Sequence, residues 1–368
     1  MQIEAAVLEA VGLDAPWRKS KPIEVAEIEL DAPGPGEVLV RMEAAGVCHS
    51  DLSRVNGVRE CKVPMVLGHE ACGVIEALGE GVADLAIGQK VAMTFMPRCG
   101  ECKSCTSPGW SLCERGTKAN AEGVMLGGGR RLHRDGQKLD HHGGVSGFAT
   151  HAVVDQHSLV AIPNEIPSDV GALLGCAVLT GGGAVLNAAK LQPGETVAVI
   201  GLGGVGLAAV LVALGVGAAE VVGIDMLDSK LESAREFGVS AAMTPTVAQS
   251  SGRKFSVVID CVGNVPALET AIALTAPGGR TVTVGLPNPA ARISIAPLSL
   301  VIEARSLIGS YMGSNIPRVD IAQYVRMYQD GRLPIEKLIS GHIALSDINQ
   351  AMDDLHEGRV LRQVITFE

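Results

Sequence analysis

The stretch Val197-Ala-Val-Ile-Gly201-Leu-Gly203-Gly-Val-Gly206-Leu-Ala-Ala-Val210 decides how this chain is expected to fold. Its glycines, spaced Gly-x-Gly-x-x-Gly, follow an apolar segment typical of a buried strand and precede an apolar segment typical of a helix. Gly201 can make the tight turn, Gly203 leaves room for a ligand beside the backbone, and Gly206 lets helix and strand pack closely. The stretch therefore predicts a strand-turn-helix unit whose helix N-terminus can bind phosphate groups.

Apolar segments along the rest of the chain indicate two domains of different type. The first 160 residues contain short Val- and Ile-rich segments between glycine-rich turns, which indicates a mostly β domain; these segments are 37–42, 71–78, 90–94 and 149–154. From about Asp169, predicted strands alternate with helical stretches, and these strands are 197–200, 221–224, 257–259 and 281–284. Such alternation predicts an α/β fold with a Rossmann doubly wound parallel sheet over residues 171–312.

Composition excludes several classes of protein. A chain of 368 residues with 47% apolar content can bury a large core, so a disordered chain is excluded and two domains are favoured. The formal net charge of -10 includes no basic block, so nucleic-acid and membrane-surface partners are not expected. No secretion signal is recognised near Met1, so a cytoplasmic location is expected. The uncharged segment 196–219 contains six glycines and is expected to be a buried strand, turn and helix.

Asp225 ends the next predicted strand, about twenty residues after the glycine turn. A carboxylate there can accept hydrogen bonds from both ribose hydroxyls of an adenosine and repels a 2′-phosphate, which favours NAD over NADP. The alternative is a tight turn with Asp225 as an ordinary helix cap. The combination of strand, helix, spacing and acid favours the nucleotide site.

Four cysteines lie close together in one short loop that also contains Gly100, Pro108 and Gly109; they are Cys99, Cys102, Cys105 and Cys113. Four thiolates complete the tetrahedral shell of a zinc ion and leave no position for a substrate, so a structural zinc is expected. An iron-sulfur cluster and a pair of disulfides are the alternatives. Both are disfavoured, because the cluster spacings differ and a cytoplasmic redox state opposes disulfides.

Three further potential ligands are far apart in the sequence: Cys48, His69 and Cys176. Two thiolates and one imidazole would leave the fourth position of a zinc ion open, which a catalytic zinc requires. Taken singly, each is more often a buried cysteine or a core histidine than a metal ligand. The order of all these motifs resembles that of the zinc-containing medium-chain alcohol dehydrogenases, over nearly the whole chain. The motifs that carry the resemblance are Gly68-His69-Glu70 with Gly73, the four-cysteine loop, Cys48 followed two residues later by a hydroxyl, Cys176 ahead of the nucleotide fold, and the glycine turn.

This resemblance implies an NAD-linked alcohol dehydrogenase with two zinc ions per subunit, and assembly into a homodimer or homotetramer. It implies a GroES-like catalytic domain at 1–170 that is completed by the tail 313–368, where the sequence shows segments at 333–339, 346–357 and 360–367. Cys48, His69 and Cys176 would bind the catalytic zinc, and the four clustered cysteines the structural zinc. Zinc lowers the pKa of bound water from 15.7 to about 7, and a bound alcohol should respond similarly. Ser50 is then expected to accept the alcohol proton while nicotinamide accepts the hydride.

The same resemblance gives other residues expected roles. Asp51 would orient His69, and Glu70 would lie behind the zinc. The expected cofactor-binding residues are Gly201, Gly203, Gly204, Val205, Gly206, Asp225, Lys230, Thr180, His49, Val284 and Arg362, with Lys230 on the ribose and Arg362 on the pyrophosphate. The expected substrate-pocket residues are Phe95, Gly143, Leu286 and Tyr311. Gly143 is expected to open space that Tyr311 can fill again, and His141 and His142 are expected to be surface-loop residues.

Two positions depart from the family pattern. Ser53 stands where liver-type members carry a relay histidine, so the proton is expected to leave through water. His49 stands where many relatives carry an arginine, so cofactor affinity is expected to fall as this histidine loses its proton. A flat dependence of the NADH dissociation constant between about pH 6 and pH 8 would count against that hypothesis.

Two other functions remain open from sequence. One is an S-(hydroxymethyl)thiol dehydrogenase acting on formaldehyde adducts, for which Arg59, Arg115 and Lys118 are the candidate cationic contacts. The other is a zinc-free relative, quinone-reductase-like or purely structural, that retains the nucleotide domain; the presence of all seven ligand residues argues against it. The sequence does not identify the alcohol, which is primary or secondary and can be bulky or aromatic.

Overall fold

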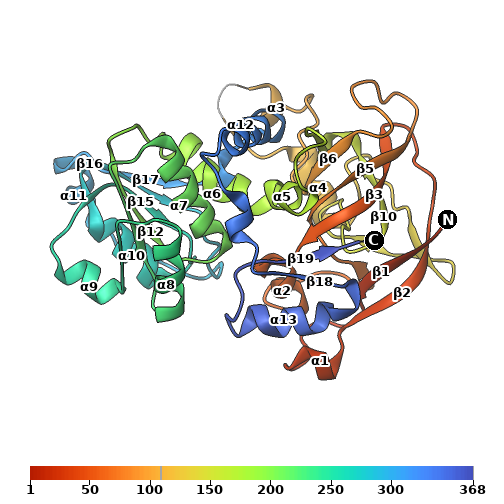
Figure 1. The fold of residues 1–368 in the computed structure, drawn as a ribbon, viewed down its shortest axis with the longest axis horizontal. Helices are drawn as coiled ribbons and strands as arrows, with labels where there is room; N and C mark the ends of the chain where they lie inside the picture. Colours follow the sequence, from red (N-terminus) through yellow and green to blue (C-terminus); the bar gives the residue numbers. More distant parts are fainter. Residues whose placement is uncertain (108–109, 368) are drawn as a thin grey trace. The chain divides into compact units, whose positions relative to one another are not determined.

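The computed structural model describes residues 1–107 and 110–367, which form two compact units (Figure 1). The first unit comprises Met1–Cys176 with Ile339–Glu368, and the second comprises Ala177–Leu338. The second unit thus continues beyond the expected limit at residue 312. Helix α12 (Pro317–Gln329) belongs to it because this helix packs against α6 (Leu179–Gly183), where the ring of Tyr324 fills the space beside Gly182. Only the segment from Ile339 onward returns to the first unit.

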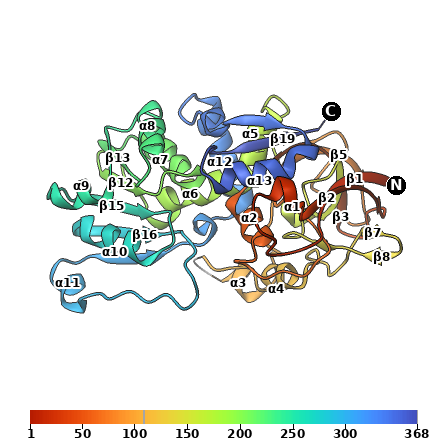
Figure 2. The same ribbon diagram turned by 90° about the horizontal axis from the view of Figure 1, so that it is seen from below.

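The second unit is built on a six-stranded parallel sheet with the order β14-β13-β12-β15-β16-β17. In chain order its strands are β12 (Thr196–Ile200), β13 (Glu220–Ile224), β14 (Ala241–Met243), β15 (Phe255–Asp260), β16 (Thr275–Thr283) and β17 (Ser306–Gly309). Figure 2 shows α7 (Gly204–Val216) and α8 (Asp228–Glu236) on one side of the sheet and α10 (Val265–Leu274) on the other. This is the doubly wound Rossmann arrangement, and the prediction of the fold class is confirmed.

The first unit is mostly β and contains two sheets, with strand orders β8-β7-β2-β1-β4-β9 and β11-β6-β5-β3-β19-β18, and with β10 paired to β3. The strands are β1 (Gln2–Leu8), β2 (Ile23–Leu30), β3 (Glu37–Gly46), β4 (Met65–Val66), β5 (Glu70–Leu78), β6 (Lys90–Thr94), β7 (Leu132–Arg134), β8 (Gln137–Lys138), β9 (Asp140–His141), β10 (His151–Asp155), β11 (Leu159–Ala161), β18 (Gly341–Ile343) and β19 (Gln363–Thr366). Strand β19 pairs antiparallel with the end of β3, Val364 opposite Gly46. The C-terminal segment therefore completes a sheet that begins near the N-terminus.

One helical run, Ser168–Ala188, is long and apolar enough to cross a membrane by length and composition alone, but 89% of its apolar window is buried inside the protein. Such burial is typical of a core helix. The run contains two π-helical turns, at Leu174–Val178 and Ala184–Ala188. The uncharged segment 196–219 forms β12 and α7, as expected, with Val197, Val199 and most of the helix fully buried.

Candidate active site

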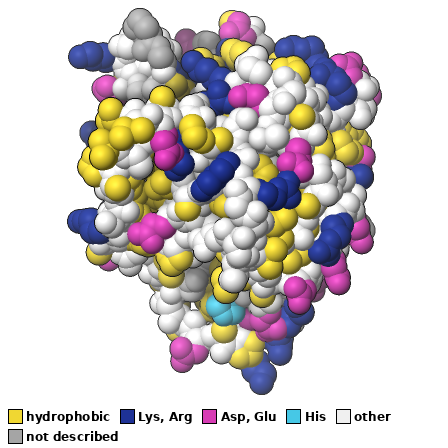
Figure 3. Space-filling model, turned by 90° about the vertical axis from the view of Figure 1, so that its left-hand side faces the viewer, with side chains coloured by type: hydrophobic (Ala, Val, Ile, Leu, Met, Phe, Trp, Pro, Cys, Tyr) yellow, Lys and Arg dark blue, Asp and Glu magenta, His cyan; other side chains and the backbone are white. Residues whose placement is uncertain are grey.

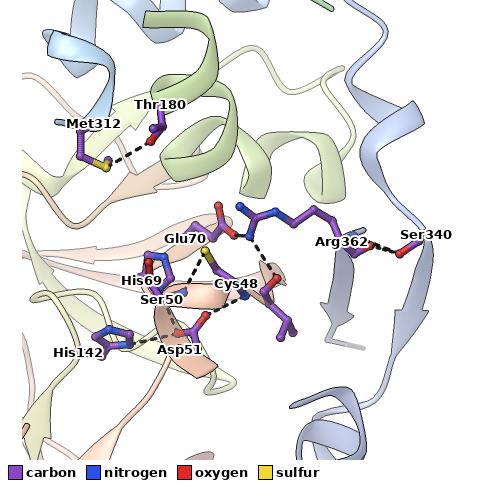
Figure 4. Close-up of polar contacts among 11 residues, drawn as sticks. Cys48, Ser50, Asp51, His69, Glu70, His142, Thr180, Met312, Ser340 and Arg362 are labelled. Atoms are coloured by element: carbon purple, nitrogen blue, oxygen red, sulfur yellow. Dashed lines mark hydrogen bonds and ion pairs between the residues drawn. The ribbon is translucent and has the colours of Figure 1, made fainter. Parts of the chain in front are cut away.

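Cys48, His69 and Cys176 come together in the first unit. Their ligand atoms all lie within 4.8 Å of one another, and the three residues are 6%, 1% and 5% exposed. Cys48 precedes α2 (His49–Val55), His69 precedes β5, and Cys176 lies in the π-helical turn Leu174–Val178. The structure therefore brings the three predicted ligands together from three separate elements, and Figure 4 shows two of them, Cys48 and His69.

Local backbone chemistry holds each ligand segment in place. Cys48 is the N-cap of α2, where its sulfur accepts a hydrogen bond from the backbone N–H of Ser50, and Asp51 Oδ2 accepts one from Cys48 N at 2.9 Å. This reciprocal arrangement is a capping box. Gly68 has φ +90°, and a Cβ there would collide with the backbone of Phe148, so only glycine allows the turn into His69. A Cβ on Gly175 would collide with Met93 O. Glycine at this position therefore lets the turn that carries Cys176 approach β6.

Asp51 fixes the orientation of the His69 ring. Asp51 Oδ1 lies 3.0 Å from His69 Nδ1, and the two side chains are 0% and 1% exposed. Burial raises the pKa of Asp51, but His69 and His142 lower it more, to about 2, so this group is a carboxylate. A carboxylate at Nδ1 favours the tautomer with the proton on Nδ1, which leaves the lone pair on Nε2. The Nε2 atom is buried and has no hydrogen-bond partner among the described residues.

The donor set fits a zinc ion. An unpartnered imidazole nitrogen beside two buried sulfurs is a ligand set that zinc prefers, and three protein ligands leave one position for a further group. The pKa of Cys48 lies well below the usual range, and the Cys176 thiol has the largest effect in lowering it. Arg362 and His69 also lower this pKa, whereas burial raises it. A lowered thiol pKa favours the thiolate, which is the form that binds a metal.

Glu70 and Arg362 lie beside this centre. Arg362 directly precedes β19, its residue is 4% exposed, and its Nη1 donates to Glu70 Oε1 at 2.6 Å and to Val47 O at 3.2 Å (Figure 4). Burial raises the pKa of Glu70 to about 7, although Arg362 opposes this. Sequence reasoning assigned Arg362 to the cofactor pyrophosphate and did not foresee its buried pair with Glu70.

His141 and His142 are not surface-loop residues, so that prediction was wrong. They are 0% and 6% exposed. His141 ends β9, which pairs with β4 and thereby carries the histidine pair inward. His142 Nδ1 lies 3.2 Å from Asp51 Oδ1, and its ring centroid lies 5.0 Å from that of His69. The local sequence, two histidines between an aspartate and two glycines, is typical of an exposed polar loop. An imidazole can nevertheless be buried where polar partners are present.

Gly143 does not open space, which corrects a second expectation. It has φ +61°, and a Cβ there would lie 2.6 Å from Cβ of Phe95. Glycine is needed at this position because of the backbone conformation and the close packing on Phe95. The Phe95 ring meets His69 edge-on, with centroids 5.2 Å apart, and so forms an apolar wall beside the ligand. Leu286 and Tyr311, the other expected pocket residues, belong to the second unit, where Leu286 is 50% exposed.

The four clustered cysteines also lie close together. Cys105 lies in α3 (Lys103–Thr106), Cys102 and Cys113 are the N-cap residues of α3 and of α4 (Glu114–Glu122), and Cys99 lies in the segment before them. Their sulfurs lie within 4.8 Å of one another. Sγ of Cys99 is 3.9 Å from that of Cys105, and Sγ of Cys102 is 4.0 Å from that of Cys113. All nine cysteines lie within the described residues and have free thiols, which argues against the disulfide alternative. Pro108 and Gly109 of this loop lie outside the described residues.

The glycine turn of the second unit has the predicted local geometry. Gly201 has φ +89°, a Cβ on Gly206 would collide with Gly201 O, and a Cβ on Gly203 would meet no atom within 4 Å. Helix α7 begins at Gly204. The close contact at Gly206 joins helix to strand, whereas the open space at Gly203 can admit a ligand, so the residues fit a dinucleotide.

The other predicted cofactor residues divide between the two units. Asp225 Oδ2 accepts from Leu202 N at 2.8 Å and lies 3.9 Å from Lys230 Nζ, so the acid and the lysine predicted at the ribose are adjacent. Thr180 is 9% exposed and Val284 is 8% exposed. His49 is exposed and Ser50 is half-buried, both at the start of α2 in the first unit.

Two family models match the chain: the alcohol dehydrogenase GroES-like domain over residues 34–164 and the zinc-binding dehydrogenase model over residues 204–330. The chain is 36% identical to alcohol dehydrogenase class-3 of Drosophila melanogaster, with 95% of this chain and 96% of the relative covered. This chain belongs to the zinc-type medium-chain alcohol dehydrogenases. The predicted family and the prediction of an oxidoreductase acting on alcohols are confirmed.

Other comparisons show members of the family with different names. S-(hydroxymethyl)glutathione dehydrogenase of Komagataella pastoris is 34% identical, with 95% of this chain and 96% of that protein covered. The crystal structure of benzyl alcohol dehydrogenase from Acinetobacter calcoaceticus superimposes with a TM-score of 0.91 at 28% identity, over 100% of both chains. The family is thus shown, and the substrate is not resolved by these relatives.

Sequence reasoning missed Asp260, a buried acid at the sheet edge in the second unit of this alcohol dehydrogenase. Asp260 ends β15 and is 0% exposed; it accepts from Val262 N at 3.0 Å and from the Thr283 hydroxyl at 2.9 Å. It therefore shapes the loop after β15. The signal was an acid at the carboxyl end of a parallel strand, the edge where doubly wound sheets bind ligands.

Proposed function

We propose that this protein is an NAD-linked alcohol dehydrogenase with one catalytic and one structural zinc ion per subunit. It interconverts a primary or secondary alcohol with the corresponding aldehyde or ketone. The observation that carries the proposal is the convergence of Cys48, His69 and Cys176 around an unpartnered His69 Nε2. A zinc-free, quinone-reductase-like function would give no reason for seven ligand residues to meet in two clusters with sulfur and nitrogen donors.

A zinc ion held by these residues supplies Lewis acidity toward the alcohol oxygen. Asp51 keeps the proton of His69 on Nδ1, so that Nε2 stays a ligand. Ser50 accepts the alcohol proton. Ser53 does not continue a relay, because its hydroxyl donates to the carbonyl of His49 at 2.7 Å, and the proton leaves from the half-buried Ser50 to water.

Asp225 supports NAD as the cofactor. Its two oxygens accept from Leu202 N at 2.8 Å and from Leu227 N at 3.1 Å, which fixes the carboxylate at the carboxyl end of β13. Each oxygen keeps a second lone pair for a ribose hydroxyl. A fixed negative charge there repels the 2′-phosphate of NADP.

A thiol adduct of formaldehyde is the second candidate substrate, favoured by the relatives named class-3 and S-(hydroxymethyl)glutathione dehydrogenase. Two of the three cations expected for an anionic thiol do not support it. Arg115 pairs with Glu101 at 2.7 Å, and Lys118 lies 4.0 Å from Glu122, both on exposed surface. We therefore favour a neutral alcohol, and Phe95 beside His69 suits an apolar or aromatic one.

A substrate panel tests the proposal. Primary, secondary and aromatic alcohols and an S-hydroxymethyl thiol adduct are compared by the absorbance of NADH formed. The highest kcat/KM is expected for an apolar alcohol. A highest value for the thiol adduct would support the second candidate, and no NAD-dependent oxidation of any of them would contradict both.

Assembly into a homo-oligomer is proposed through the second unit. Helix α11 (Pro297–Ile302) exposes Leu298, Val301 and Ile302, which are 66%, 78% and 73% exposed, and the edge strand β17 is close to it in the chain. Figure 3, which faces the side that carries α11 in Figure 1, shows hydrophobic side chains gathered on the surface. Such patches mark interfaces. A monomer mass measured by light scattering would contradict this assembly.

The cytoplasmic location expected from the sequence stays a prediction.

A further inference from the structure

The described residues place a second side chain, besides that of His69, on the carboxylate that orients His69. His142 Nδ1 lies 3.2 Å from Asp51 Oδ1, the same oxygen that lies 3.0 Å from His69 Nδ1 (Figure 4). This is a close electrostatic contact and not a hydrogen bond of good geometry, and Nδ1 of His142 has no hydrogen-bond partner among the described residues. A buried imidazole nitrogen that faces a carboxylate oxygen is favourable only when it carries the proton, so His142 presents an N–H to Asp51.

Asp51 is the point through which this contact acts on the metal ligands. Its Oδ2 accepts from Cys48 N at 2.9 Å, and its Oδ1 faces His69 and His142. One carboxylate thus joins the backbone of one ligand to the ring of another. Without His142, Oδ1 has one partner fewer, and the carboxylate gains freedom to rotate about its own axis. Any such rotation moves both Cys48 and His69.

The protein holds His142 rigidly in this position. His142 N donates to Val66 O at 3.2 Å and to the Ser146 hydroxyl at 3.2 Å, and His142 O accepts from the backbone N–H groups of Val145 and Ser146. The following Gly143 packs against Phe95, whose ring meets the other side of His69. His69 is therefore supported by Asp51, Phe95 and the tilted ring of His142, 5.0 Å away.

We propose that His142 is a positioning residue that, through Asp51, fixes Cys48 and His69 in the geometry in which they hold the catalytic metal. Its role is to slow the release of that metal. The inference rests on the proposed zinc site. Residues in the second layer of metal sites typically change affinity by about 10- to 100-fold when they are replaced.

Zinc release to a chromophoric chelator from the full-length holoenzyme tests this. The kinetic phase that is missing in Cys48→Ala belongs to the catalytic site. His142→Phe, which keeps a ring but loses the N–H, is expected to speed this phase about 10- to 100-fold. His142→Asn places an amide N–H near the position of Nδ1 and is expected to restore slow release. His141→Phe is the matched control, because His141 is equally buried in the same turn but has no contact with Asp51.

Each outcome is decisive. Equal release rates in His142→Phe and His141→Phe, or no rescue by asparagine, would overturn the inference. If His142→Phe does not fold, His142→Asn is compared with His142→Gln, whose amide lies one carbon farther out. Slow release for asparagine and fast release for glutamine supports the inference, and equal rates overturn it. Absence of zinc from the wild-type protein would instead refute the proposed function.

Discussion

Arg362 donates a hydrogen bond to Glu70 at 2.6 Å in the protein interior, where the two side chains are 4% and 0% exposed. The same guanidinium donates to the carbonyl of Val47 at 3.2 Å. Glu70 directly follows the ligand His69, and Val47 directly precedes the ligand Cys48. A residue that directly precedes the returning strand β19 therefore ties together two segments from the first 70 residues that carry proposed zinc ligands.

Replacing Arg362 is expected to destabilise the protein strongly. Arg362→Met leaves Glu70 buried without its cationic partner, which costs about 3–5 kcal/mol. Arg359→Met is the matched control, because Arg359 pairs with Asp354 on the surface and is 46% exposed, so its loss costs about 0–1 kcal/mol. Urea unfolding measures both. Equal midpoints for the two variants would show that the buried pair has no special role.

Two glycines of the same turn are expected to respond differently to alanine. Gly206→Ala forces a Cβ onto Gly201 O and separates helix α7 from β12, so the melting temperature should fall by several degrees or the variant should not fold. Gly203→Ala meets no atom within 4 Å and should keep the melting temperature of the wild type while weakening NADH binding. Calorimetry and NADH titration separate the two effects. Unchanged cofactor affinity in Gly203→Ala would argue against pyrophosphate binding at this turn.

Removing the carboxylate of Asp225 is expected to relax the choice of cofactor. Asp225→Gly loses the ribose hydrogen bonds and the charge that repels a phosphate. The ratio of kcat/KM for NAD over NADP should fall by about 10-fold or more, since hydrogen bonds to a charged group contribute about 1.5–3 kcal/mol. Asp228→Asn, three residues later at the start of α8, should leave the ratio unchanged. An unaltered ratio in Asp225→Gly would remove this residue from the ribose site.

His141 is expected to make stability fall in mild acid. Burial lowers its pKa to about 3, with Arg130 and Arg131 adding to this effect, whereas an unfolded chain has the ordinary value of 6.5. Between these values the unfolded chain binds a proton that the folded protein does not, so stability is present above pH 6.5 and is lost as the pH falls toward 3. His141→Gln should weaken the decrease in the urea midpoint between about pH 7 and pH 5. The same pH slope in both proteins would contradict the assignment.

Sequence reasoning was strongest where the relevant residues are close in the chain. The glycine turn after β12 and the four-cysteine loop are local patterns with local physical causes. It was weakest where burial depends on distant pairing. The inward position of His142 follows from β9 pairing with β4, and the space at Gly143 is filled by Phe95 from another segment. The extension of the second unit to Leu338 depends on packing of α12 that no local pattern encodes.

The most direct measurement is zinc per chain by elemental analysis of the wild type, Cys48→Ala and Cys102→Ser. The expected contents are about two, one and one zinc ions, because each variant removes one ligand from one site. Cys48→Ala should lose alcohol oxidation with its fold intact, and Cys102→Ser should mainly lose thermal stability, because a structural zinc contributes folding free energy. Wild-type protein without zinc, or Cys48→Ala with the wild-type content, would contradict a catalytic metal held by Cys48, His69 and Cys176.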